Sequence, residues 1–140
     1  MKKLAVLFIL FLAVGVAMSY GQDENKKGEP WDIPEKYNKM DNPVDMDDKQ
    51  LMRVGRSLYS RFCKSCHGRN GEGDGPKARR LDTFPGDFTT CAFKEQDDGE
   101  LYYKSIIGRD EMPNYEKKIP NKEDRWAVIT YIKKMNKCDK

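Results

Sequence analysis

Two cysteines and a histidine form the most chemically specific pattern in the sequence, Cys63-Lys64-Ser65-Cys66-His67. In a C-x-x-C-H pattern the two thiols can form thioethers with the vinyl groups of a haem, and the adjacent imidazole can bind the iron from one face. On a helical turn, side chains three residues apart face the same side, so both thiols can reach one macrocycle. The pattern therefore predicts one covalently attached haem c, with Cys63 and Cys66 as attachment points and His67 as an iron ligand.

Other uses of paired cysteines fit this sequence less well. A thioredoxin-like pair begins a helix after a strand, whereas Cys63 and Cys66 close an expected helix. A zinc site needs four ligands, and the remaining cysteines, Cys91 and Cys138, lack the paired spacing of a zinc knuckle. His67 is the only histidine in the sequence, which excludes an internal bis-histidine haem, a second conventional c-type haem and a distal catalytic histidine.

The second axial position of the iron can be taken by methionine, lysine, tyrosine or nothing. Met112 is the best placed methionine, because Pro113 forces it into an extended backbone and so presents its thioether from a loop. A methionine that only fills the core would look the same. The other methionines lie in the N-terminal segments, on a helix or near the chain's end: Met1, Met18, Met40, Met46, Met52 and Met135.

A helix is expected to carry the haem-attachment pattern. Asp47 or Asp48 can cap it, and it is expected to end near Gly68. Its apolar residues recur at spacings of three and four: Leu51, Val54, Leu58, Tyr59 and Phe62. Residues 68–76 are too rich in glycine for a helix or a strand and are predicted to form a loop. A short helix can follow at residues 77–81, and residues 83–90 are expected to be irregular.

Two further helices are expected in the second half of the chain. Asp97 or Asp98 can begin a short one that Gly108 ends. Asn121 can begin the last one, which is amphipathic and closes in lysines near its negative dipole end. Its apolar residues are Trp126, Val128, Ile129, Tyr131, Ile132 and Met135. Because no segment alternates with a period of two, the fold class is predicted to be all-α, with three to five helices and long loops.

Residues 50–135 resemble a class I c-type cytochrome, the small bacterial kind with a single haem. The motifs that carry the resemblance are Cys63 to Gly68, Gly73-Asp74-Gly75-Pro76, Pro85 to Thr89, Met112-Pro113, and Trp126 to Ile132. The resemblance implies a cytochrome c fold wrapped around one covalent haem with His67 and Met112 as axial ligands. It also implies that the Pro76 carbonyl accepts the proton of the second nitrogen of His67, and that Gly55 and Tyr59 lie where the first helix crosses the last.

Cys91 and Cys138 depart from the family pattern, in which the two haem cysteines are commonly the only ones. In an oxidising compartment, an even number of remaining cysteines suggests a disulfide, here between the central loop and the last helix. Two free thiols are the alternative.

The N-terminus reads as an export signal. Met1-Lys2-Lys3 precedes fifteen apolar residues, 4–18, which fall short of the roughly 20 that a membrane-spanning helix needs. We therefore expect a signal peptide over residues 1–21, a polar, proline-containing arm over residues 22–48 and a cytochrome c domain over residues 49–140. The protein is expected to be periplasmic or otherwise exported, with an uncleaved membrane anchor as the less favoured reading. The arm can either dock on the core or remain a solvated linker, and its prolines favour an extended path.

Charge separates the arm from the core. Residues 22–50 hold nine acidic and five basic residues, and residues 51–140 hold fourteen acidic and nineteen basic ones. The basic excess is too small to support nucleic-acid binding. It suits an acidic redox partner, with candidate steering residues near the haem edge: Lys64, Arg69, Lys77, Arg79 and Arg80.

The predicted function is one-electron transfer between respiratory partner proteins, and the chain is not expected to be an enzyme. With both axial positions filled, no small-molecule substrate could bind at the iron. One alternative is a haem subunit in a stable membrane complex, such as a periplasmic dehydrogenase or a quinol-oxidising complex. A less favoured one is a ligand-binding haem sensor or enzyme in which Met112 is displaced.

Overall fold

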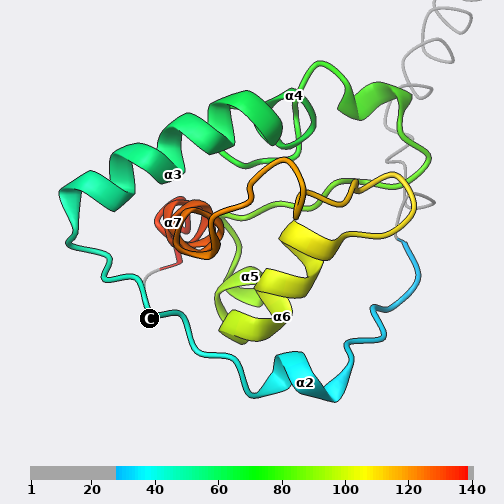
Figure 1. Cartoon of the computed structure of the whole chain (residues 1–140). Helices are drawn as coiled ribbons and strands as arrows, with labels where there is room; N and C mark the ends of the chain where they lie inside the picture. Colours follow the sequence, from blue (N-terminus) through cyan, green and yellow to red (C-terminus); the bar gives the residue numbers. More distant parts are fainter. Residues whose placement is uncertain (1–27, 139–140) are drawn as a thin grey trace, which may run out of the picture.

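Two helices, α3 (Lys49–Phe62) and α7 (Lys122–Lys133), cross at the centre of the fold, and Figure 1 shows α7 end-on beneath α3. The computed structural model describes residues 28–138, so the predicted signal peptide lies outside the described residues. At the crossing, a Cβ atom on Gly55 would lie 2.8 Å from the carbonyl carbon of Ala127 and 2.9 Å from Cβ of Tyr131. Only glycine therefore allows the two backbones to approach this closely.

Both central helices begin at capping residues that the sequence indicates. The Asp48 side chain accepts hydrogen bonds from the amides of Gln50 and Leu51, and the Asn121 side chain accepts one from the amide of Glu123. The helix expected to run to Gly68 is divided: α3 ends at Phe62, and a separate turn, α4 (Lys64–His67), carries the rest of the cysteine pattern. Gly68 then leaves the helix with φ 82°, in the left-handed region that favours glycine.

The second half of the chain surrounds α7. The 3-10 turn η2 (Ala78–Arg80) and the short helix α5 (Cys91–Lys94) precede α6 (Asp98–Tyr102). A π-helical segment, η3 (Tyr103–Ile107), continues α6 and ends at Gly108. The core side chains come mainly from α6, η3 and α7, with Tyr59 from α3: Tyr59, Phe88, Phe93, Leu101, Tyr102, Ile106, Trp126, Val128, Ile129 and Ile132.

The prediction of an all-α fold is confirmed. Within residues 28–138 there are six α-helical segments and no strand, apart from one isolated bridge between Arg109 and Met112. The count exceeds the three to five expected because three of the segments are single turns of four residues. Single turns such as α5, capped by the Thr90 side chain, are too short to show a periodic apolar pattern.

The N-terminal arm lies along the outside of the core. It runs past α6 and η3, through the single turn α2 (Glu35–Asn38), to the start of α3 (Figure 1). Val44 is buried, and the Asn42 side chain donates a hydrogen bond to the Thr130 hydroxyl at 2.9 Å. Of the two arrangements that the sequence left open, the described part of the arm adopts the docked one, and it is not wholly extended because it contains α2.

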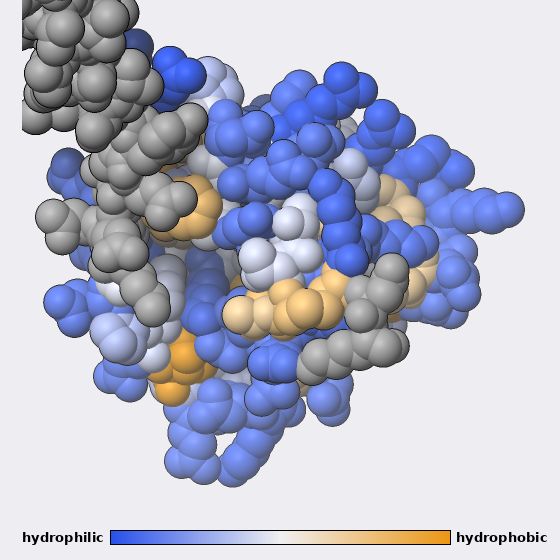
Figure 2. All heavy atoms as spheres, turned by 180° about the vertical axis from the view of Figure 1, so that it is seen from behind, coloured by the Kyte–Doolittle hydropathy of each residue, from blue (hydrophilic) through white to orange (hydrophobic). Residues whose placement is uncertain are grey.

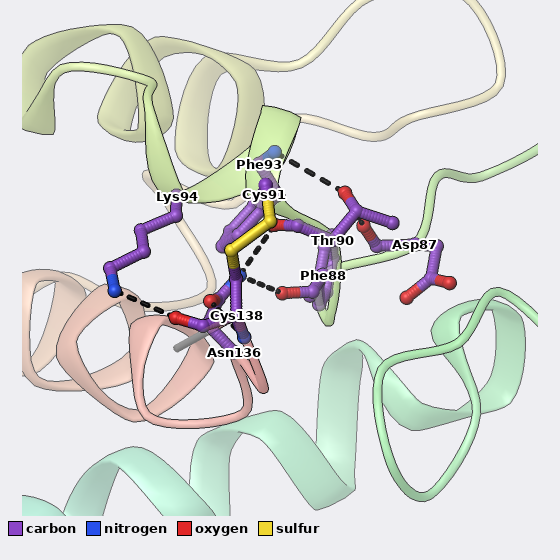
Figure 3. Close-up of a disulfide and its surroundings, with 8 residues drawn as sticks. All are labelled: Asp87, Phe88, Thr90, Cys91, Phe93, Lys94, Asn136 and Cys138. Atoms are coloured by element: carbon purple, nitrogen blue, oxygen red, sulfur yellow. Dashed lines mark hydrogen bonds between the residues drawn. A yellow bond between two sulfur atoms is a disulfide. The ribbon is translucent and has the colours of Figure 1, made fainter. Parts of the chain in front are cut away.

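Cys91 and Cys138 are joined as a disulfide, with Cα atoms 5.1 Å apart (Figure 3). The segment after α7 is also held there by the Asn136 side chain, which donates to the carbonyls of Phe88 and Thr90. The Lys94 ammonium donates to the Cys138 carbonyl at 2.7 Å. The end of the described chain is therefore tied to the loop that leads into α5.

Candidate haem site

A cavity of about 760 Å³ lies between the cysteine pattern and the loop that carries Met112. Its lining includes all four predicted haem-binding side chains, Cys63, Cys66, His67 and Met112. The rest of the wall is largely apolar, and its aliphatic and aromatic members include Phe62, Leu81, Phe84, Phe88, Phe93, Leu101, Ile106, Tyr115, Ile119, Val128 and Ile132. A cavity of this size and character suits a large apolar cofactor, since cofactor cavities measure roughly 300–1,000 Å³.

The two thiols lie at the junction of α3 and α4. Cys63 directly follows α3, between that helix and α4, and is buried, whereas Cys66 lies one turn further on and is half-buried. The amides of Cys66 and His67 both donate to the Cys63 carbonyl, at 3.1 and 3.0 Å, which holds the turn. Burial, with the neighbouring Cys66, raises the pKa of Cys63 to about 12. Neither thiol is joined to another cysteine, so both are available for thioether bonds.

His67 is almost completely buried, at 6% exposure, and its ring stacks on Phe88 with centroids 4.5 Å apart. Burial lowers the pKa of His67 to about 4, so the imidazole is neutral, which is the form that binds metals. Its Nδ1 atom is buried and has no hydrogen-bond partner among the described residues. A buried imidazole with an unsatisfied nitrogen, on the wall of a large apolar cavity, fits the axial ligand of a haem.

Pro76 lies in an exposed turn, and its carbonyl makes no hydrogen bond to His67 in the described structure. The turn is nevertheless fixed against α4: the amides of Gly75 and Lys77 donate to the carbonyls of Cys66 and Ser65. The structure therefore brings the Pro76 turn next to the cysteine pattern, and the predicted hydrogen bond remains a prediction.

Met112 projects from the loop after η3 and packs against the core cluster. Its amide donates to the Arg109 carbonyl at 2.8 Å. Three residues later, Tyr115 fixes the loop on both sides: its amide donates to the Ile106 carbonyl at 2.8 Å, and its hydroxyl donates to the Phe62 carbonyl at 3.0 Å. The loop that carries Met112 is thus joined to α3, immediately before Cys63.

Arg125, which the sequence analysis did not single out, holds the remainder of this loop. It is buried, and its guanidinium donates to the carbonyls of Ile119, Glu116 and Pro120 and to the Tyr102 hydroxyl. A buried arginine needs such partners, because an unpaired buried charge is costly. The only signal in the sequence was its position directly before the apolar segment that starts at Trp126.

Trp31, from the N-terminal arm, also lines the cavity and was likewise missed as a site residue. The zinc alternative gains no support: within the part of the chain that the structure describes, no three His, Cys, Asp or Glu side chains form a group that could hold a metal ion. No helix between residues 28 and 138 is long and apolar enough to cross a membrane.

A helical domain with a C-x-x-C-H turn on the wall of a large apolar cavity defines a c-type cytochrome. The family model described as cytochrome C oxidase, cbb3-type, subunit III matches residues 50–132, and the chain belongs to this family. Its cofactor is accordingly a covalently bound haem c, and its chemistry is haem-based electron transfer. No curated protein matches the chain. The match includes all four predicted haem-binding residues but begins after Trp31 and ends before Cys138.

Proposed function

We propose that this protein is a one-electron carrier whose haem is attached through Cys63 and Cys66 and whose iron is held by His67 and Met112. The observation that carries the proposal is that these four side chains line one cavity of about 760 Å³. When bound, the haem supplies one-electron exchange through the Fe(II)/Fe(III) couple.

The residues of the chain set the conditions for that exchange. The Met112 thioether is a weak, soft donor that favours the ferrous state and raises the reduction potential. The apolar wall, with Phe88 against His67, excludes water and favours the less charged state. With both axial positions filled, the chain leaves no place for a substrate at the iron, which supports a carrier and not an enzyme.

A visible spectrum of the reduced and oxidised protein, repeated with carbon monoxide on the reduced form, tests the ligand set. We expect a low-spin c-type spectrum that carbon monoxide does not change, and a weak long-wavelength sulfur-to-iron band in the oxidised protein. The band should be absent in Met112→Ala and retained in Met52→Leu, a matched change of a methionine on α3. A wild-type spectrum that shifts readily with carbon monoxide would instead indicate a sensor or an enzyme.

The partner is proposed to be a respiratory redox protein with an acidic docking face. Five basic residues around α4 and η2 are all exposed: Lys64, Arg69, Lys77, Arg79 and Arg80. Such a surface accelerates association with an acidic partner at low ionic strength. If this proposal is correct, electron-transfer rates with such a partner should fall as salt increases, and charge reversal at Arg79 and Arg80 should weaken this dependence.

The second candidate is a haem subunit of a stable membrane complex, favoured by the oxidase-subunit description of the family. Co-purification after mild detergent extraction distinguishes it from a free carrier. For either role we propose export, a signal peptide over residues 1–21 and an arm that begins at Gln22. N-terminal sequencing of the mature protein tests the cleavage site and the start of the arm. A mature chain that begins at Met1 would overturn the proposed cleavage.

A further inference from the structure

The arm touches the core along its whole described length. At the C-terminal end of the arm, the ammonium of Lys134 donates to the Met46 carbonyl at 2.6 Å, and the Asn42 amide donates to the Asp98 carboxylate at 3.1 Å. In the middle, the Tyr37 ring packs on Tyr103, with centroids 4.8 Å apart. A Cβ on Gly99 could not be accommodated, because the backbone of Tyr37 already occupies its place. These contacts reach α6, η3 and the residue that caps the end of α7, so the described arm is an integral layer of the domain.

At the N-terminal end of its described part, the arm is held by Arg109, a residue of the Met112 loop. The guanidinium of Arg109 lies over the Trp31 ring, 4.2 Å from its centroid, and donates to the carbonyls of Pro30 and Glu29. Its Nε faces Asp110 at 3.7 Å, so each of its nitrogens has a partner. The Trp31 ring also makes an edge contact with Tyr103, with centroids 6.2 Å apart. Trp31 and Arg109 both line the cavity.

Arg109 is joined in turn to Met112. The Met112 amide donates to the Arg109 carbonyl at 2.8 Å, and the two residues form the isolated bridge. On the other side of Arg109, Gly108 has φ 69° and lies against the Met112 carbonyl, which leaves no space for a Cβ. The loop between Gly108 and Met112 is therefore a tight turn, and a displacement of Arg109 would move Met112.

We propose that residues 28–48 form a strap that latches the Met112 loop in place, with Trp31 and Arg109 as positioning residues for the Met112 thioether. The strap has two effects: it closes one wall of the cavity with the Trp31 ring, and it restrains the turn that presents Met112. This inference rests on the proposed function in that Met112 is the axial ligand. It extends that function to a segment that the family match, residues 50–132, does not include.

The test measures how easily the Met112 loop opens in the oxidised holoprotein, with imidazole as an added ligand that competes for the iron. We expect Trp31→Ala and Arg109→Gln each to raise the imidazole binding rate about tenfold, equivalent to a loss of about 1.4 kcal/mol from the closed state. The double variant should show about the same rate as either single one, because both belong to one latch. Trp31→Phe keeps a ring under the guanidinium and should restore most of the wild-type rate.

Lys39→Ala is the matched control, because Lys39 is in the arm but, within residues 28–138, its exposed side chain pairs with Glu35 alone. Its imidazole rate should equal that of the wild type. Equal rates in wild type, Trp31→Ala and Arg109→Gln would overturn the latch. An increase in Lys39→Ala as large as in Trp31→Ala would also overturn it, since any loosening of the arm would then suffice.

Hydrogen exchange separates failure of the latch from failure of the ligand assignment. The Met112 amide is protected by the Arg109 carbonyl whether or not the thioether binds iron. If the wild type lacks the sulfur-to-iron band, the assignment of Met112 fails, and faster exchange at Met112 in Trp31→Ala would still support the latch on the loop. Unchanged exchange there would overturn it independently of the spectrum.

Discussion

The Tyr59 hydroxyl donates a hydrogen bond to the Gly68 carbonyl at 2.7 Å, and so joins the last turn of α3 to the residue that directly follows His67. Both residues are buried. Burial raises the pKa of the Tyr59 hydroxyl well above its usual value, so it remains a donor throughout the physiological range. The position of the His67 turn, α4, is thus fixed by a side chain of the preceding helix, α3.

Tyr59→Phe should lower the free energy of unfolding of the holoprotein by about 1–3 kcal/mol, because the Gly68 carbonyl would be left buried without a partner. Denaturant titration measures the loss. Tyr131→Phe is the control. The Tyr131 ring also contacts the Tyr59 ring, with centroids 5.5 Å apart, but the Tyr131 hydroxyl makes no hydrogen bond to another described residue. Both variants keep their rings, so equal losses would contradict a specific contribution of the hydrogen bond to Gly68.

Gly55→Ala should destabilise the protein by about 1–3 kcal/mol or more, because the added methyl group meets the backbone of α7, which cannot move aside locally. On an exposed helical site the same change would be stabilising. Ser57→Ala, an exposed change on the same helix, is the control. A Gly55→Ala variant as stable as wild type in guanidinium would contradict the close crossing of α3 and α7.

Arg125→Lys should lower the stability by about 2 kcal/mol or more, because lysine keeps the charge but cannot reach the carbonyls of Ile119 and Glu116 and the Tyr102 hydroxyl together. Because these carbonyls belong to the loop that carries Met112, the sulfur-to-iron band should disappear on heating before the helical circular dichroism does. Lys122→Met, a change at an exposed cation of the same helix, is the control: the sulfur-to-iron band and the helical circular dichroism should be lost at the same temperature.

Replacement of both Cys91 and Cys138 by serine should cost roughly 4 kcal/mol in the chain-entropy treatment, since the disulfide closes a loop across 47 positions. Thermal unfolding with and without a thiol reductant measures it: reductant should lower the midpoint of the wild type and leave the double variant unchanged. A wild type indifferent to reductant would indicate two free thiols.

The raised pKa of the buried Tyr115 hydroxyl predicts that the protein loses stability at alkaline pH. Burial raises its pKa from about 10 to about 12, so the phenol stays protonated in the fold but ionises in the unfolded chain. The unfolded state therefore binds fewer protons, and the free energy of unfolding should fall as pH rises from about 10 to about 12. Tyr115→Phe should be less stable near neutral pH, without its bond to Phe62, and should show a shallower fall. Parallel pH profiles would contradict this assignment.

Local patterns predicted the parts of the structure that depend on neighbours in the sequence. The caps at Asp48 and Asn121 and the glycine that ends the α6 region, Gly108, follow from short-range chemistry, and all three occur. The resemblance added the α3 and α7 crossing at Gly55, which only a long-range contact could reveal.

The residues that were missed act across long distances in the chain. Arg125 reads as one more cation at the start of an amphipathic helix, and only the fold turns it toward the carbonyls of the Met112 loop. Trp31 lies 78 positions before Arg109 (109 − 31), and no local pattern links the two. The surface residues gave no signal for a binding site, because few of them are apolar. The face shown in Figure 2 is mostly hydrophilic, and the large exposed apolar residues of the described chain are Met46 and Phe84.

We also expect the docked arm to constrain the order in which the protein matures. Its partners are residues of α6, η3 and α7, together with Arg109, and all of them follow the cysteine pattern in the chain. The arm therefore precedes its partners in the chain, and its contacts with α7 can form only after that helix has formed. Cys63 is buried in the finished domain, whereas it must be accessible when its thioether bond forms. Because Trp31 of the arm lines the cavity, we expect the haem to be attached before the arm docks, although the arm precedes the haem-binding residues in the chain.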